Sequence, residues 1–216
     1  MPKVFISHSS KDEEIVKDVN YNLRLAQIEP LIAEFEKAGF PPYRTIDQMI
    51  EQSDALFLFL TPNVTDSPYT QNWVTYELSA AHTLRKKAFV FEELNRQVQF
   101  PVPYLTHYFL YDPQRKGDRN KIIEIAKSQV PSVDVGAFVV GGILGAPFWP
   151  LGSLIGGAIT SSLAADQRSR AIFSQDITCP YPNCGIGFKL YSELYDGFRW
   201  NCPSCRRELV WSLRDC

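Results

Sequence analysis

One short segment constrains the fold of this chain more than any other: six consecutive apolar residues, ALFLFL, at positions 55–60. A strand with one face in water alternates apolar and polar side chains, so this unbroken run indicates a strand buried on both faces. Similar runs at 3–6, 30–33, 88–91 and 108–111 alternate with helical patterns. The alternation predicts an α/β fold, with a doubly wound parallel sheet of five strands covered by helices on both sides.

The expected helices lie between these strands, at about 11–27, 44–53, 68–85 and 118–129. Ligands of such a sheet bind beyond the carboxyl ends of its strands. Trp73 and Glu77 lie four residues apart on the third helix, which follows the central strand, and they therefore share one helical face. An aromatic ring and a carboxylate in that position predict a small polar pocket with an apolar wall.

Four motifs occur in these elements and the loops that follow them. They read VFISHSSKD at 4–12, EPLIAEFEKAG at 29–39, SDALFLFLTPN at 53–63 and NWVTYEL at 72–78. In this order and at these distances, they resemble the Toll/interleukin-1 receptor (TIR) domain over residues 1–130. The resemblance implies the flavodoxin-like five-stranded fold. The Trp-x-x-x-Glu spacing is similar to that of prokaryotic TIR proteins that cleave NAD+.

By this resemblance, Glu77 is the catalytic glutamate of an NAD+ nucleosidase or cyclase that breaks the nicotinamide–ribosyl bond. One carboxylate suffices for this reaction. The nicotinamide nitrogen is positively charged in NAD+, so nicotinamide leaves as a neutral molecule and needs no general acid to protonate it. The carboxylate would stabilise the oxocarbenium-like ribosyl cation. Whether the product is linear or cyclic ADP-ribose is left open. The residues expected to bind the substrate are Ser7, His8, Ser9, Lys11, Gly39 and Trp73.

The resemblance also implies a cytoplasmic immune or antiviral signalling effector that self-associates to become active. No signal peptide is expected, because the chain begins Met-Pro-Lys and enters an apolar run at once. Two alternatives remain: a non-enzymatic TIR scaffold assembling at a membrane, and a TIR protein whose C-terminal module senses a foreign molecule. Glu77 distinguishes the enzyme from the scaffold, because a protein that only assembles a signalling complex does not need a catalytic glutamate. The net charge of −2 argues against non-specific nucleic-acid binding as the main function.

After a short linker at 131–134, the 31 residues of 135–165 contain no charged side chain. Two prolines near the middle divide the stretch into two arms. Each arm has two glycines four residues apart, at 141 and 145 and at 152 and 156, a spacing that allows helix backbones to approach closely. The stretch predicts a helical hairpin. Its role is open among membrane association, packing between protomers and a glycine-rich linker.

All five cysteines follow residue 178, and four of them form two pairs, Cys179-x4-Cys184 and Cys202-x2-Cys205, with 17 residues between the pairs. Four thiolates at such spacing predict a tetrahedral Zn²⁺ site, and a site filled by cysteine alone is structural. A redox disulfide pair and free core cysteines are the alternatives. Residues 172–216 resemble a zinc ribbon. We expect metal removal to unfold this module and to leave the TIR-like region folded.

Overall fold

A computed structural model describes residues 1–33, 43–112, 123–124, 127, 130, 173–192 and 194–212. The elements of the first part of the chain are β1 (Lys3–Ser7), α1 (Glu13–Leu25), β2 (Glu29–Ile32), α2 (Tyr43–Gln52), β3 (Ala55–Leu60), α3 (Pro62–Thr65), α4 (Pro68–Thr83), β4 (Lys87–Glu93), the 3₁₀ helix η1 (Leu94–Arg96) and β5 (His107–Tyr111). Those of the last part are β6 (Phe173–Thr178), β7 (Gly187–Ser192), β8 (Arg199–Asn201) and β9 (Glu208–Val210).

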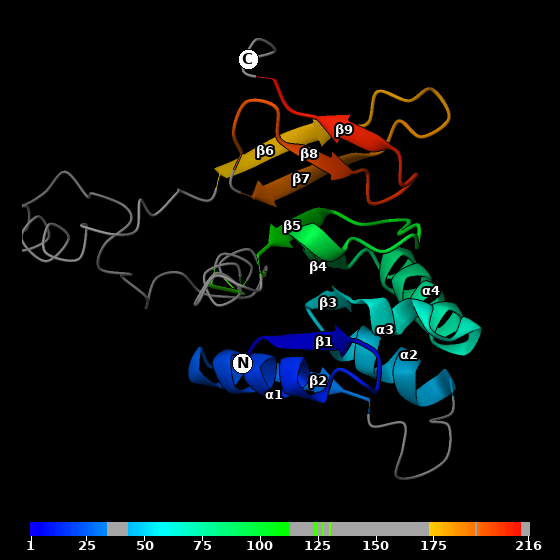
Figure 1. The fold of residues 1–216 in the computed structure, drawn as a ribbon. Helices are drawn as coiled ribbons and strands as arrows, with labels where there is room; N and C mark the ends of the chain where they lie inside the picture. Colours follow the sequence, from blue (N-terminus) through cyan, green and yellow to red (C-terminus); the bar gives the residue numbers. More distant parts are fainter. Residues whose placement is uncertain are drawn as a thin grey trace, which may run out of the picture. The chain divides into compact units, whose positions relative to one another are not determined.

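The larger sheet has seven strands in the order β2-β1-β3-β4-β5-β7-β6 (Figure 1). The neighbours from β2 through β5 to β7 are parallel, and β6 is antiparallel to β7. The doubly wound parallel sheet expected from the sequence is confirmed. The sheet has seven strands rather than the expected five, because β7 and β6 of the tail extend it beyond β5. Each of the five strands expected from the sequence lies within two residues of its expected bounds.

Side chains of β3 alternate between the two faces of the sheet and are buried on both. Leu56, Leu58 and Leu60 join a core cluster with buried residues of α2 and α4. Phe57 and Phe59 join a second cluster with buried residues of α1. Burial of a Phe or Leu side chain is worth about 1.5–3 kcal/mol, so the apolar run at β3 holds both helical layers on the sheet.

The helices also form close to their expected positions. Ser67 precedes α4 with an extended backbone and Pro68 occupies its first turn, although the Ser67 side chain makes no capping hydrogen bond. The helix expected at 118–129 lies almost entirely outside the described residues. The hairpin expected at 135–165 and its linker at 131–134 also lie outside them. Among the helices that the structure describes, none is both long enough and apolar enough to cross a membrane.

The cysteine-bearing tail differs from the separate module expected at 172–216. β7 pairs in parallel with β5 and thereby continues the larger sheet, while β8 and β9 form a small antiparallel sheet. Phe188, Phe198 and Trp200 belong to the same core cluster as Leu58 and Val90. Residues 1–133 and 172–216 accordingly form one compact unit. The physical reason is size, because so short a segment buries too little apolar surface by itself.

Candidate active site

Glu77 lies on the buried side of α4. The neighbouring residues Trp73, Val74, Leu78 and Ala81 of this helix are packed into the core beside it. The Glu77 side chain itself is only 3% exposed. Trp73 and Glu77 are therefore on one buried face, as the four-residue spacing predicted. A carboxyl group in this layer is energetically costly unless it is protonated or paired.

The hydrogen-bond partner of Glu77 comes from β1. Ser7 is the last residue of that strand, and its Oγ donates a hydrogen bond to Oε2 of Glu77 over 2.5 Å. Ser7 is also buried, at 1% exposure. The bond joins residues 70 positions apart and places the carboxyl group at the carboxyl end of β1. This is the edge where a sheet of this kind binds its ligands.

Burial raises the pKa of the Glu77 carboxyl to about 8, and the Ser7 hydrogen bond opposes the rise. Desolvation disfavours the charged form of a carboxyl, whereas a donated hydrogen bond favours it. Within the described part of the chain, Glu77 forms no salt bridge. A strongly shifted titratable group at a ligand-binding edge is a physical marker of a functional site.

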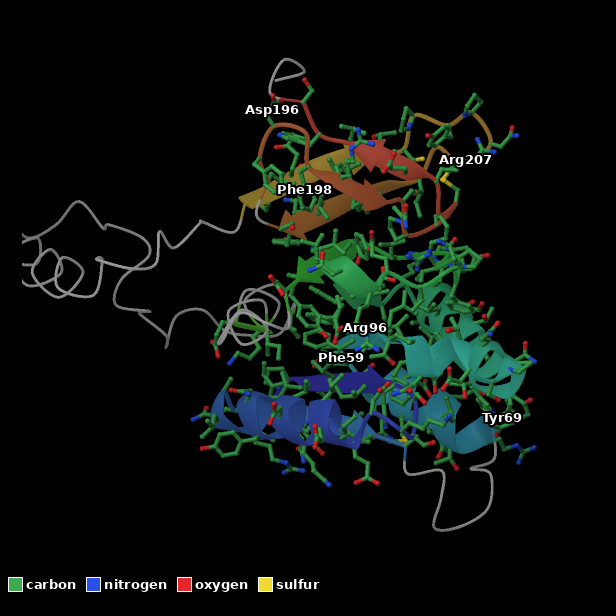
Figure 2. The ribbon with its side chains drawn as sticks, in the orientation of Figure 1. Phe59, Tyr69, Arg96, Asp196, Phe198 and Arg207 are labelled. Carbon is green, nitrogen blue, oxygen red and sulfur yellow. The ribbon has the colours of Figure 1, made fainter. Side chains whose placement is uncertain are left out.

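Aromatic rings surround Trp73. The Tyr43 ring stacks on it with centroids 4.7 Å apart, and Tyr69 and Tyr76 meet it edge-on at 6.0 and 5.8 Å. Tyr43 and Tyr69 are 60% and 44% exposed, and Figure 2 shows Tyr69 at the first turn of α4. Burial and a hydrogen bond to Asp47 raise the pKa of Tyr76 to about 12, so this ring stays neutral. The cluster is a wall on which a planar ring could stack.

The loop after β1 contains the other expected binding residues. Nδ1 of His8 lies 3.3 Å from the Ile6 carbonyl oxygen, and burial lowers the pKa of this ring, which keeps it neutral. Ser9 is buried, and its Oγ accepts a hydrogen bond from the Lys11 amide over 3.4 Å. Nζ of Lys11 lies 3.0 Å from Oδ2 of Asp66 at the surface. Of this set, Ser7 is the residue that contacts Glu77. Gly39 lies outside the described residues.

One structural residue of the site was not singled out from the sequence. Asp12 is buried and accepts hydrogen bonds from Thr61 Oγ1 over 2.6 Å and from Asn63 Nδ2 over 2.5 Å. These bonds tie the loop after β1 to the start of α3, which follows β3. The sequence contained a clue to this contact, because Asp12 is the last residue of the first motif and Thr61 and Asn63 lie at the end of the third.

Comparison with known proteins supports the resemblance on independent grounds. A family profile described as "TIR domain" matches residues 4–118, which is more than half of the chain. The chain belongs to the TIR domain family. No curated protein matches it.

Two solved structures are similar to parts of this TIR protein. One is the TIR domains of the activated Roq1 resistosome that recognises the effector XopQ, with 16% identity and a TM-score of 0.37. That match covers 43% of this chain and 58% of the Roq1 chain, so this chain spans less than two thirds of that protein. The other is the Clostridium botulinum CMP N-glycosidase BcmB, with 18% identity, a TM-score of 0.39 and coverage of 58% and 98%.

The TIR protein's tail brings its four paired cysteines together. All four sulfurs lie within 4.8 Å of one another, with 3.7 Å between Cys179 and Cys205 and 3.9 Å between Cys184 and Cys202. These cysteines are free rather than disulfide-bonded. A tetrahedral ion with Zn–S bonds of about 2.3 Å requires sulfurs about 3.8 Å apart. The donor set and its geometry fit a metal ion.

Proposed function

We propose that this TIR domain cleaves the nicotinamide–ribosyl bond of NAD+ and that Glu77 is its catalytic carboxylate. The observation that carries the proposal is a buried carboxyl group whose partner is the neutral hydroxyl of Ser7. A structural carboxylate in such a place is paired with a cation, which compensates for its desolvation. An uncompensated one has a large affinity for positive charge and is suited to a substrate that brings or develops it.

NAD+ supplies that charge. Its nicotinamide nitrogen is formally positive in the ground state, and binding beside Glu77 lowers the carboxyl pKa and favours the ionised form. When the C–N bond breaks, the bonding pair leaves with nicotinamide, and the positive charge moves to the ribosyl carbon and ring oxygen. The carboxylate stabilises this cation. Attack by water then forms the new C–O bond and releases a proton, which gives ADP-ribose.

The substitution Glu77→Gln tests the assignment. Glutamine keeps the volume and can still accept the Ser7 hydrogen bond, but it has no charge. Groups of this kind are worth about 10²–10³ in rate, so NAD+ cleavage by the purified full chain should fall by at least that factor. Glu14→Gln, which changes an exposed acid at the start of α1, is the matched control and should leave the rate unchanged. Equal rates for Glu77→Gln and wild type would contradict the assignment.

The raised pKa favours a second candidate function. At pH 7 a carboxyl with a pKa of about 8 holds its proton and can act as a general acid. This would suit an N-glycosidic bond whose base is neutral and must be protonated to leave, as in a nucleoside monophosphate. The pH profile of kcat/KM separates NAD+ cleavage from this second function. If the ionised carboxylate is required, activity rises as the pH passes through about 8. If the protonated acid is required, activity falls over the same range.

We also propose that the four cysteines bind a structural Zn²⁺. The sulfur separations support this, and binding of metal by thiolates couples to the folding of such small modules. Elemental analysis of protein purified under reducing conditions should find one zinc atom per chain. Protein that contains no metal under those conditions would refute the proposal.

Self-association remains part of the proposal as well. Activity per molecule should rise steeply with protein concentration if neighbouring TIR domains complete the site. The double variant Gly141→Leu/Gly152→Leu, chosen to disturb the close helix approach that the sequence predicts for 135–165, should weaken that dependence. A wild-type monomer whose specific activity is flat from the nanomolar to the micromolar range would contradict it.

A further inference from the structure

The two cysteine pairs end in the same backbone conformation but with different residues. Gly185 follows Cys184 with φ +57°, and Arg206 follows Cys205 with φ +57°. This left-handed region favours glycine, and a side chain there is kept only when the surroundings hold it. Arg206 therefore needs an explanation that Gly185 does not.

The explanation lies in the guanidinium contacts of Arg206. Nε donates a hydrogen bond to the Phe100 carbonyl oxygen over 2.6 Å, and Nη1 lies 3.0 Å and 3.3 Å from Oε2 and Oε1 of Glu92. The side chains of Arg206 and Glu92 are 6% and 0% exposed. The tail thus places its buried cation against a buried carboxylate at the carboxyl end of β4, 114 positions earlier in the chain.

Glu92 also accepts hydrogen bonds from the segment after β4 and from β5. Oε1 accepts a hydrogen bond from the Val98 amide over 2.6 Å, and Oε2 accepts one from the Tyr108 hydroxyl. The carboxylate thereby joins β4, the segment after it and β5. Arg206 supplies a positive charge beside this carboxylate and compensates for its burial.

Two further bonds connect the same segment to the second cysteine pair. The Asn201 amide donates to Oε1 of Gln97 over 3.0 Å, and the Val102 amide donates to the Pro203 carbonyl oxygen over 2.8 Å. Residues 97–102 are consequently held by the turn that contains Cys202 and Cys205.

We propose that the four-cysteine site controls the order of the TIR domain at residues 92–102. A metal ion fixes the turn 202–206, the turn presents Arg206, and Arg206 neutralises Glu92. Loss of the metal frees the turn and leaves Glu92 buried without its cation, so this end of β4 opens. The inference rests on the metal proposed above. It also replaces the expectation that the TIR domain survives metal removal unchanged.

Amide hydrogen exchange on the full chain tests the proposal, with zinc removed by a chelator and its loss confirmed by elemental analysis. Protection of peptides covering 92–102 should fall on the order of 100-fold, because removal of one partner of a buried ion pair is strongly destabilising. Peptides of α1, which packs on the opposite face of the sheet, should change far less. Unchanged protection at 92–102 after confirmed zinc loss would overturn the inference while leaving the zinc proposal intact. Protein purified without metal would overturn both.

Variants separate the ion pair from general unfolding of the tail. Arg206→Gly matches Gly185, so the chain should keep its zinc yet show low protection at 92–102 even before chelation. The double variant Glu92→Gln/Arg206→Gly removes both charges of this ion pair, so protection at 92–102 should return. Chelation should then lower that protection much less than it does in wild type. Arg199→Ala, which removes an exposed partner of Glu208, is the matched control and should behave as wild type. Wild-type protection in Arg206→Gly would refute the role of the ion pair.

Discussion

Among the residues that the structure describes, Glu77 and Glu92 are buried and have opposite surroundings. Glu92 on β4 is fully buried and receives an arginine, a tyrosine hydroxyl and a backbone amide. Glu77 on α4 is 3% exposed and receives the hydroxyl of Ser7. A paired carboxylate specifies how segments fit together, whereas an uncompensated one costs stability and is retained where chemistry uses it. This difference is why we propose a structural role for Glu92 and a catalytic role for Glu77.

The largest expected effect comes from breaking the compensated pair. Arg206→Met keeps the length of the side chain but removes the charge, which leaves the Glu92 carboxylate buried without its cation. Removal of one partner of a buried ion pair typically costs about 3–5 kcal/mol. Urea unfolding of the full, zinc-loaded chain at pH 7 would measure it. A loss below about 1 kcal/mol would show that Arg206 does not compensate Glu92.

The uncompensated site should respond to pH instead. The pKa of Glu77 is about 8 in the folded protein and near 4.5 when solvated, so the folded state holds this proton more tightly. The contribution of this protonated carboxyl to the free energy of unfolding is complete below about pH 4.5 and is lost as the pH rises through 8. Wild type should therefore lose about 1.4 kcal/mol per pH unit relative to Glu77→Gln between about pH 5 and pH 8.

Thermal unfolding of both proteins across that range checks this prediction. For a chain of this size, about 1.4 kcal/mol corresponds to a shift in Tm of about 3–6 °C per pH unit. Parallel curves for wild type and Glu77→Gln would mean that Glu77 does not titrate in this window. They would also remove the main distinction between the two glutamates.

A smaller effect is expected from Ser7→Ala. The Ser7 hydrogen bond lowers the pKa of Glu77, so its removal should raise that pKa further. If the carboxylate is the active form, the rise of kcat/KM with pH should move upward by about one pH unit. Ser10→Ala, at an exposed position in the same loop, is the control. A downward shift would contradict the hydrogen-bond assignment.

The smallest effect is expected at an exposed ion pair of the tail. Arg199 Nη1 lies 3.1 Å from Glu208 Oε2, and both side chains are more than half exposed. Solvent screens such pairs, so Glu208→Gln should change the free energy of unfolding by less than about 0.5 kcal/mol. The same urea measurement applies. A loss as large as that of Arg206→Met would show that burial is not what distinguishes the Glu92 pair.

Local patterns in the sequence determined much of this protein. The apolar run at 55–60 indicated a strand buried on both faces, and β3 is buried throughout. The four-residue spacing of Trp73 and Glu77 placed them on one face of α4, because helical periodicity is a local property. The cysteine spacing likewise indicated a cluster of four sulfurs, which the structure brings within 4.8 Å.

Only the tertiary structure decided what surrounds these groups. The bond from Ser7 to Glu77 spans 70 positions and that from Arg206 to Glu92 spans 114. No local pattern in the sequence indicates such partners. The pKa of Glu77 depends on how completely the packed helices and sheet exclude water from its carboxyl group. The pairing of β7 with β5 depends on which apolar surfaces of the sheet the other elements leave exposed. Burial and charge compensation are set by residues distant in sequence, so they emerge only when the chain has folded.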